Sequence, residues 1–132
     1  MSETQAGRFL IETRGATRNL GAFVVAARFS RDGAAAAFAL GDGTMHLTRA
    51  AEREIWRCVA VHDGAVPAAS QDPGPSGFVS AGDDGGLRRI SADGEVSDIA
   101  DFGMKWVEQA TTCALEKGKG LLACSVGKFI HL

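Results

Sequence analysis

A histidine followed by an aspartate is the feature of this sequence that most resembles a reactive site. His62 precedes Asp63, and such a pair can perform general acid–base catalysis when both groups face a substrate. The other reading is structural, with a buried histidine held in place by a carboxylate. We favour the structural reading, because no nucleophile-elbow, P-loop, HExxH or dinucleotide-binding pattern accompanies the pair.

Metal and phosphate sites have weak support. His46 and His131 lie in the first and third of the repeat units described below, so we do not expect them to share a metal ion. Gly82, Gly85 and Gly86 are not followed by a predicted helix, so we do not expect them to hold a phosphate. We therefore predict neither a metal nor a cofactor.

The cysteines indicate a reducing compartment. Cys58, Cys113 and Cys124 are odd in number and have no CxxC spacing, so we interpret them as small apolar side chains. The N-terminus shows no secretory signal pattern, and no apolar run approaches the roughly 20 residues that span a bilayer. We predict a cytoplasmic protein that does not bind membranes.

Length and composition indicate the number of domains and the classes of partner to expect. The 132 residues make one ordinary domain, and a 45% hydrophobic fraction is enough for a packed core. The formal net charge of −2 argues against nucleic acid as a partner. Seventeen glycines and only three prolines favour many tight turns.

Short apolar runs separated by Asp-Gly turns predict strands throughout. The alanine-rich run 34–40 favours helix by propensity, but seven residues between two turns are too few for a stable helix. We also expect residues 50–54 to form a loop. The predicted strands are 21–29, 34–40, 44–49, 55–61, 62–70, 78–82, 87–91, 95–100, 105–115, 121–127 and 128–132.

These strands repeat. Met45, Leu87 and Ile130 occupy one repeat position, at spacings of 42 and 43 residues. A period in the low forties predicts an all-β fold of β-propeller-type, four-stranded antiparallel blades, about three in number. Blade 1 would span 21–61, blade 2 would span 62–100 and an incomplete blade 3 would span 101–132. A sandwich of unrelated strands is the alternative, but it leaves the period unexplained.

Two arginines and two tryptophans in the predicted strands have both a structural and a functional interpretation. Arg88 and Arg89 form a basic step, which we interpret as a solvated or ion-paired strand face rather than a nucleic-acid site. Trp56 and Trp106 are expected to pack between blades.

The second unit resembles the WD40-repeat β-propeller family, and the resemblance extends over about residues 21–132. His62, Ser80 and Asp84 match the family's pattern of a histidine before the first strand, a serine in the second strand and an aspartate in the next turn. Ile90 stands where the family has the tryptophan of its Trp-Asp dipeptide. The resemblance implies that the three matching residues form a structural hydrogen-bond network, weaker than the family's own.

The resemblance also implies a function. Propellers of this family are rigid platforms for proteins or peptides, and the residue before the turn aspartate often faces the partner. Here that residue is Asp83, which would favour a basic peptide; the other reading is an ordinary solvated turn residue. The leading hypothesis is a non-catalytic scaffold or interaction module. The alternative is a propeller-type hydrolase or lyase, which would need a polar or metal cluster in the channel.

Three predicted blades are too few to close a propeller ring, which has about 4–8 blades. Open sheet edges would invite self-association. In one arrangement the chain is a fragment of a longer propeller, without an independent role. In the other, two copies form a six-bladed ring, in which a closing strand at 8–13, within the N-terminal segment 1–20, pairs with residues 128–132 of the second copy. The abrupt end favours the fragment.

Overall fold

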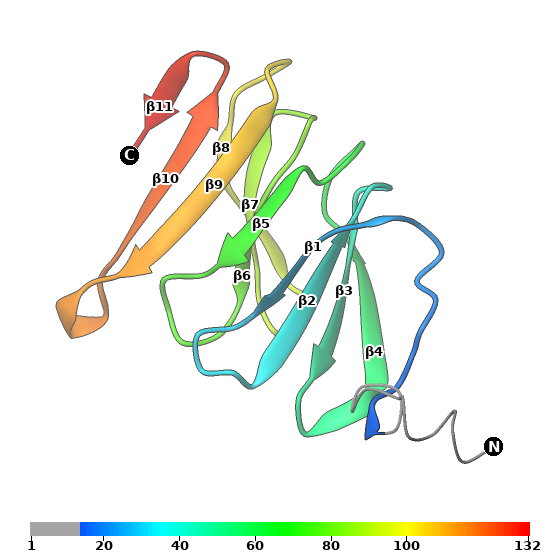
Figure 1. Ribbon diagram of the computed structural model, residues 1–132. Coiled ribbons are helices and arrows are strands. Elements are labelled where there is room, and N and C mark those ends of the chain that lie inside the picture. The colour runs from blue at the N-terminus through cyan, green and yellow to red at the C-terminus, as the bar shows by residue number, and fades with distance from the viewer. Residues whose placement is uncertain (1–13) are drawn as a thin grey trace, which may run out of the picture.

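The computed structural model describes residues 14–132, and its regular structure consists of β-strands and one short 3-10 helix (Figure 1). The all-β expectation is therefore confirmed. The alanine-rich run forms a strand, as predicted, and lies almost wholly buried. In chain order the elements are β1 (Val24–Phe29), β2 (Ala35–Leu40), β3 (Thr44–Arg49), β4 (Glu52–Ala60), β5 (Ala68–Gln71), β6 (Phe78–Ala81), β7 (Gly86–Ile90), β8 (Val96–Asp101), β9 (Val107–Ala114), η1 (Glu116–Gly118), β10 (Gly120–Val126) and β11 (Phe129–His131).

The strands form three antiparallel sheets, each made from one continuous stretch of chain. The first sheet has the order β1-β2-β3-β4 and the second has the order β5-β6-β7-β8. The third sheet contains β9, β10 and β11. Each sheet is open, and every strand pairs with its neighbour in the sequence.

The three sheets stack face to face in chain order, with β5 lying between β1 and β9 (Figure 1). Alternate residues of β2 face the second sheet, and because they are alanines the sheets approach closely. Two buried cores result. The core between the first two sheets contains Ala35, Ala37, Ala39, Met45, Leu47, Val61, Val66, Ala69, Phe78 and Ile90. The core between the second and third sheets contains Val79, Ala81, Leu87, Val107, Cys124 and Val126.

The loops that lead from one sheet to the next are attached in the same way at both junctions. The backbone oxygen of Gly43 accepts hydrogen bonds from the N–H groups of Val61 and His62, each at 3.0 Å, and that of Gly85 accepts one from Phe102 at 2.8 Å. Both glycines have positive φ, +89° and +83°. A Cβ would lie 2.3 Å from a loop oxygen at Gly43 and 2.0 Å from one at Gly85. Only glycine fits either position.

Arg31, in the turn between β1 and β2, connects all three sheets. Its Nε donates to the backbone oxygen of Asp72 at 2.9 Å, in the loop between β5 and β6. Its Nη2 donates to the backbone oxygen and to Oγ1 of Thr112, in β9, both at 2.9 Å. The Thr112 hydroxyl in turn donates to the backbone oxygen of Gln71.

Several predicted boundaries were wrong. The first strand begins at Val24 rather than at residue 21, and β4 begins at Glu52, so residues 52–54 are strand and not loop. Residues 62–67 form a loop, and β5 begins directly after Pro67, whose missing N–H cannot join a ladder. The predicted closing strand at 8–13 lies outside the described residues.

Neither tryptophan packs between sheets, contrary to expectation. Trp106 is 61% exposed in the loop before β9. Trp56 packs against Phe38, with ring centroids 5.6 Å apart, on the face of the first sheet that points away from the second. The guanidinium of Arg18 lies 4.8 Å from the Trp56 ring centroid, so a cation–π contact covers part of that face.

Candidate functional site

The structure brings His62, Ser80 and Asp84 together at one junction. His62 lies in the loop between β4 and β5, Ser80 in the middle of β6, and Asp84 in the turn between β6 and β7. The imidazole Nε2 is 2.8 Å from Ser80 Oγ, and Nδ1 is 3.0 Å from Asp84 Oδ1. The imidazole therefore connects the incoming loop to both a strand and a turn of the second sheet.

Asp84 receives most of the hydrogen bonds at this junction. Its Oδ2 accepts from the backbone N–H of Asp63, and its Oδ1 accepts from that of Gly86, both at 2.9 Å. Asp42, the turn aspartate of the first sheet, likewise accepts from the N–H of Thr44 at 3.0 Å. The aspartate at this position thus closes the turn in both sheets, and in the second it also holds the loop.

Arg88 is a fourth member of the network that the sequence did not indicate. Its Nη1 donates to Asp84 Oδ2 at 2.9 Å and to the backbone oxygen of Val61 at 2.8 Å, and its Nε donates to Asp98 at 2.9 Å. Arg88 pairs with Ser80 across β6 and β7, so both side chains lie on one face. Ile90, at the position of the family's tryptophan, is instead fully buried in the core between the first two sheets.

The hydrogen bonds around His62 favour the tautomer that carries its proton on Nδ1. The Nη1 group of Arg88 has two hydrogens and lies near three acceptors, including His62 Nδ1 at 2.8 Å. Directing those hydrogens to Val61 and Asp84 leaves Nδ1 free to carry a proton and donate it to Asp84. Nε2 then accepts from the Ser80 hydroxyl, and every group in the network is satisfied.

Burial and charge set the protonation states. Burial lowers the pKa of His62 and outweighs the opposing effect of the Asp84 carboxylate, so the imidazole is neutral near pH 7. Partial burial alone would raise the pKa of Asp84, but hydrogen bonds from Arg88 and from the N–H groups of Gly86 and Asp63 hold it well below its usual range. The hydrogen bond to Asp84 raises the pKa of Arg88.

The side chains are hydrogen-bonded in the order Ser80, His62, Asp84, which is also the order in a Ser-His-Asp catalytic triad, and both distances suit such a triad. The access that catalysis needs is lacking, because Ser80 is completely buried and the His62 side chain has no exposed surface. A substrate carbonyl therefore has no route to Ser80 Oγ in this conformation. The geometry instead suits the fastening of a loop to a sheet.

Asp83 lies at the same end of the sheets, and its side chain is half-buried. Its backbone N–H donates to the oxygen of Ala65 at 3.3 Å, and its carboxylate occupies the space that a Cβ on Gly64 would fill. We call this end the Asp83 end. It carries the turns β2–β3, β6–β7 and β10–β11 and the loops before β5 and β9.

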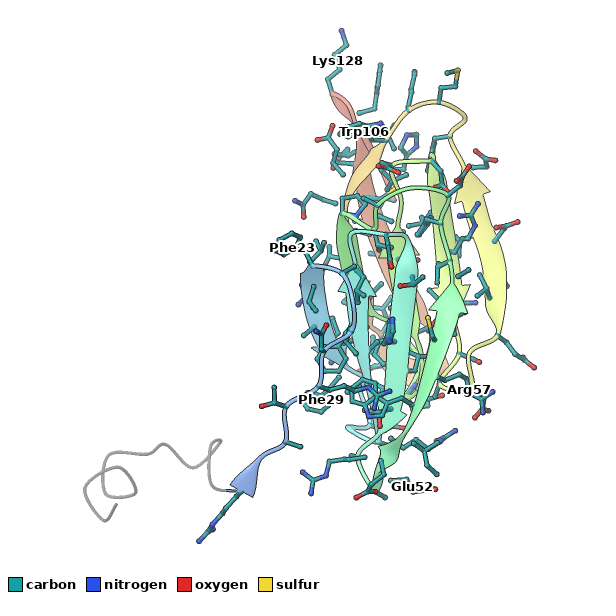
Figure 2. The ribbon with its side chains drawn as sticks, turned by 90° about the vertical axis from the view of Figure 1, so that its right-hand side faces the viewer. Phe23, Phe29, Glu52, Arg57, Trp106 and Lys128 are labelled. Atoms are coloured by element: carbon teal, nitrogen blue, oxygen red, sulfur yellow. The ribbon has the colours of Figure 1, made fainter. Side chains whose placement is uncertain are left out.

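Large apolar side chains are exposed at the Asp83 end. Met104 is 99% exposed, Phe23 is 91% exposed and Trp106 is 61% exposed. Figure 2 shows Phe23, Trp106 and Lys128 toward this end and Phe29 and Glu52 toward the opposite one. The acidic residues at this end include Asp42, Asp63 and Asp83.

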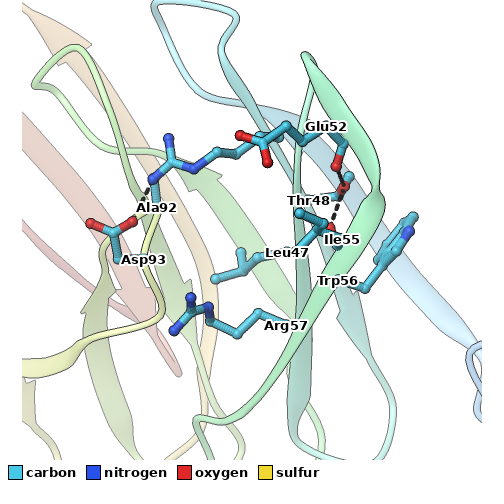
Figure 3. Close-up of a pocket in the computed structure, with 9 residues that line it drawn as sticks. Leu47, Thr48, Glu52, Ile55, Trp56, Arg57, Ala92 and Asp93 are labelled. Atoms are coloured by element: carbon cyan, nitrogen blue, oxygen red, sulfur yellow. Dashed lines mark hydrogen bonds and ion pairs between the residues drawn. The ribbon is translucent and has the colours of Figure 1, made fainter.

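A small cavity of about 240 Å³ lies at the other end, between the hairpin of β3 and β4 and the turn that joins β7 to β8 (Figure 3). An ion pair between Arg49 and Asp93 crosses it. The only hydroxyl among its lining side chains belongs to Thr48 and is bonded to the backbone oxygen of Ile55 at 2.9 Å. The cavity thus offers no activated nucleophile.

Within residues 14–132, no three histidine, cysteine or acidic side chains are grouped closely enough to hold a metal ion. Over the same residues there is no helix with the length and hydrophobicity to cross a membrane. No model of a known protein family matches the chain, and no relative is found among curated proteins.

Proposed function

We propose that this chain is a WD40-like, β-propeller-type interaction module whose sheets act as blades and whose Asp83 end binds a protein segment. One observation carries the proposal: the repeated junction, in which the loop to the next sheet is attached to Gly43 and again, at the equivalent turn, to Gly85. The His62 network strengthens the first of these junctions. A rigid frame that gathers loops at one end can present a binding surface on those loops.

The chemistry of the Asp83 end supports a peptide that is both basic and apolar as the proposed partner. Exposed Met104, Phe23 and Trp106 offer apolar and aromatic contact area of the residue types that are enriched in protein interfaces. The carboxylates of Asp42, Asp63 and Asp83 lie at the same end of the sheets. A peptide that combines basic with apolar side chains matches both features.

The test is a fluorescence-polarisation screen of equal-length peptides that vary in net charge and aromatic content. We expect basic, aromatic peptides to bind best, and more weakly at higher salt. Asp83→Lys should weaken their binding by roughly fivefold, about 1 kcal/mol. Asp93→Asn changes an exposed aspartate at the opposite end and should leave binding unchanged. Equal affinity for acidic and basic peptides would contradict the proposal.

A serine-reactive fluorophosphonate separates this proposal from the hydrolase alternative. Because Ser80 is buried, we expect no labelling of the folded protein. Covalent labelling that disappears in Ser80→Ala would replace the interaction module with an acyl-transfer enzyme.

A further inference from the structure

The outward face of the third sheet is uncovered at a position that the other two sheets bury. Ile130 pairs with Ser125 in the register position that Met45 and Leu87 hold in the first and second sheets. Met45 is 0% exposed and Leu87 is 2% exposed, because each packs against the next sheet. Ile130 is 84% exposed.

The rest of this face has the same character. Leu132 is 83% exposed and Leu121 is 41% exposed, and a hollow of about 240 Å³ lies beside Ile130 and Leu132. The β9 and β10 side chains on the face are uncharged: Gln109, Thr111, Cys113, Leu121, Ala123 and Ser125. Another sheet could therefore cover the face without burying an unpaired charge. We call it the third-sheet face.

The complementary face, equivalent to the one on which each later sheet packs against the sheet before it, lies on the first sheet. In the second sheet, the residues that pack against the first sheet include Phe78. In the third sheet, Cys124 and Val126 pack against the second sheet. In β2 the matching face carries Ala36 and Phe38 and points away from the second sheet. We call it the first-sheet face. A cavity of about 740 Å³ adjoins it, lined in part by Phe29, Ala36 and Phe38 and also by Arg18, whose guanidinium covers the Trp56 part of the face.

We infer that the chain self-associates, with the third-sheet face of one copy packed on the first-sheet face of a second. A second copy is the occupant because both halves of the missing interface are present in one chain, at opposite ends of its stack. Two copies related by a twofold axis can each use both faces when the three sheets fan through half a turn, which closes the assembly as a dimer; without that turn the same contact would extend into an open chain of copies. The inference depends on the stacking of the sheets and not on peptide binding at the Asp83 end.

Light scattering and sedimentation test the inference directly. The wild-type chain should have twice the mass of the 13.8 kDa protomer at about micromolar concentration. Ile130→Asp on the third-sheet face and Phe29→Asp on the first-sheet face should each weaken association at least about tenfold. Both side chains are already exposed, so circular dichroism should show folded variants. Met104→Asp, on a loop away from both faces, is the control and should remain dimeric.

Mixing the two variants shows which faces meet. Each variant keeps one intact face, so an equimolar mixture should form a heterodimer that neither variant forms alone. A monomeric wild-type chain overturns the inference. So does a Phe29→Asp variant that remains fully dimeric, because the third-sheet faces would then pair with each other.

Discussion

Arg31 Nη2 lies 2.9 Å from both oxygens of Thr112, which is 81 residues further along the chain. This relationship joins the turn of the first sheet to the first strand of the third, across the second sheet. A charged donor that satisfies a backbone carbonyl and a hydroxyl together is stronger than a neutral hydrogen bond. The three sheets are therefore held together by the Arg31 hydrogen bonds, at the end opposite the Asp83 end, as well as by the two apolar cores.

Replacing Arg31 with alanine should loosen the stack. We expect the free energy of unfolding to fall by about 1–3 kcal/mol, because three acceptors lose a charged donor. Urea denaturation measures the change. Arg28→Ala is the matched control, since Arg28 bonds only to the oxygen of its neighbour Ala27 among the described residues; it should cost less than about 0.5 kcal/mol. Equal losses would show that the Arg31 contacts contribute nothing specific.

Asp84→Ala should destabilise the second sheet and the loop before it. The substitution removes the acceptor of Arg88, His62 and two backbone N–H groups, and we expect a loss of about 1–3 kcal/mol. Thermal unfolding measures it. Asp83→Ala, one residue earlier, should have a smaller effect on the melting temperature. An unchanged melting temperature in Asp84→Ala would mean that the network is energetically irrelevant.

Acid should weaken the fold in two stages. His62 has a lowered pKa in the folded protein, so below about pH 6.5 the unfolded chain binds a proton more readily and stability falls. Asp84, whose pKa is also lowered, adds a second loss as the pH drops below 3.8. Melting temperatures measured from pH 8 to pH 3 should show both. His62→Gln should be less stable at pH 7, and its melting temperature should depend less on pH between pH 7 and pH 5. An unchanged dependence would mean that a group other than His62 causes the first loss of stability.

Gly82 should tolerate no side chain, although its φ is not in the left-handed region. A Cβ there would lie 2.1 Å from His62 Nδ1 and 2.5 Å from Asp84 Oδ1. Gly82→Ala must displace the imidazole, and we expect a loss of about 1–3 kcal/mol. Gly41→Ala is the control, because the nearest atom to its Cβ would be 3.8 Å away. Chemical denaturation of both variants should show a large loss only for Gly82→Ala.

Much of the fold could be predicted from turns and run lengths. The Asp-Gly turns limit residues 34–40 to a length that suits a strand, and this limit overrides the helical preference of alanine. The start of β4 was missed because its first four residues are exposed. Such an edge strand carries no alternation of polar and apolar residues from which it could be predicted.

The network was only partly predictable. His62, Ser80 and Asp84 stand out as residue types that match a known pattern. Arg88 does not, since an exposed arginine and a bonded one have the same local sequence. One signal was available: once β6 and β7 are paired as a hairpin, Arg88 lies opposite Ser80. The Arg31 contact had no such signal, because it depends on how three sheets stack.

The confinement of each sheet to one continuous stretch of chain has a consequence for synthesis. The first sheet contains all of its pairing partners by Ala60, so it can fold while the rest of the chain is still on the ribosome. The attachment of His62 to Gly43 can follow at once, whereas the His62 network must wait for Arg88 to emerge. The contact between Arg31 and Thr112 forms last, after two sheets are already in place.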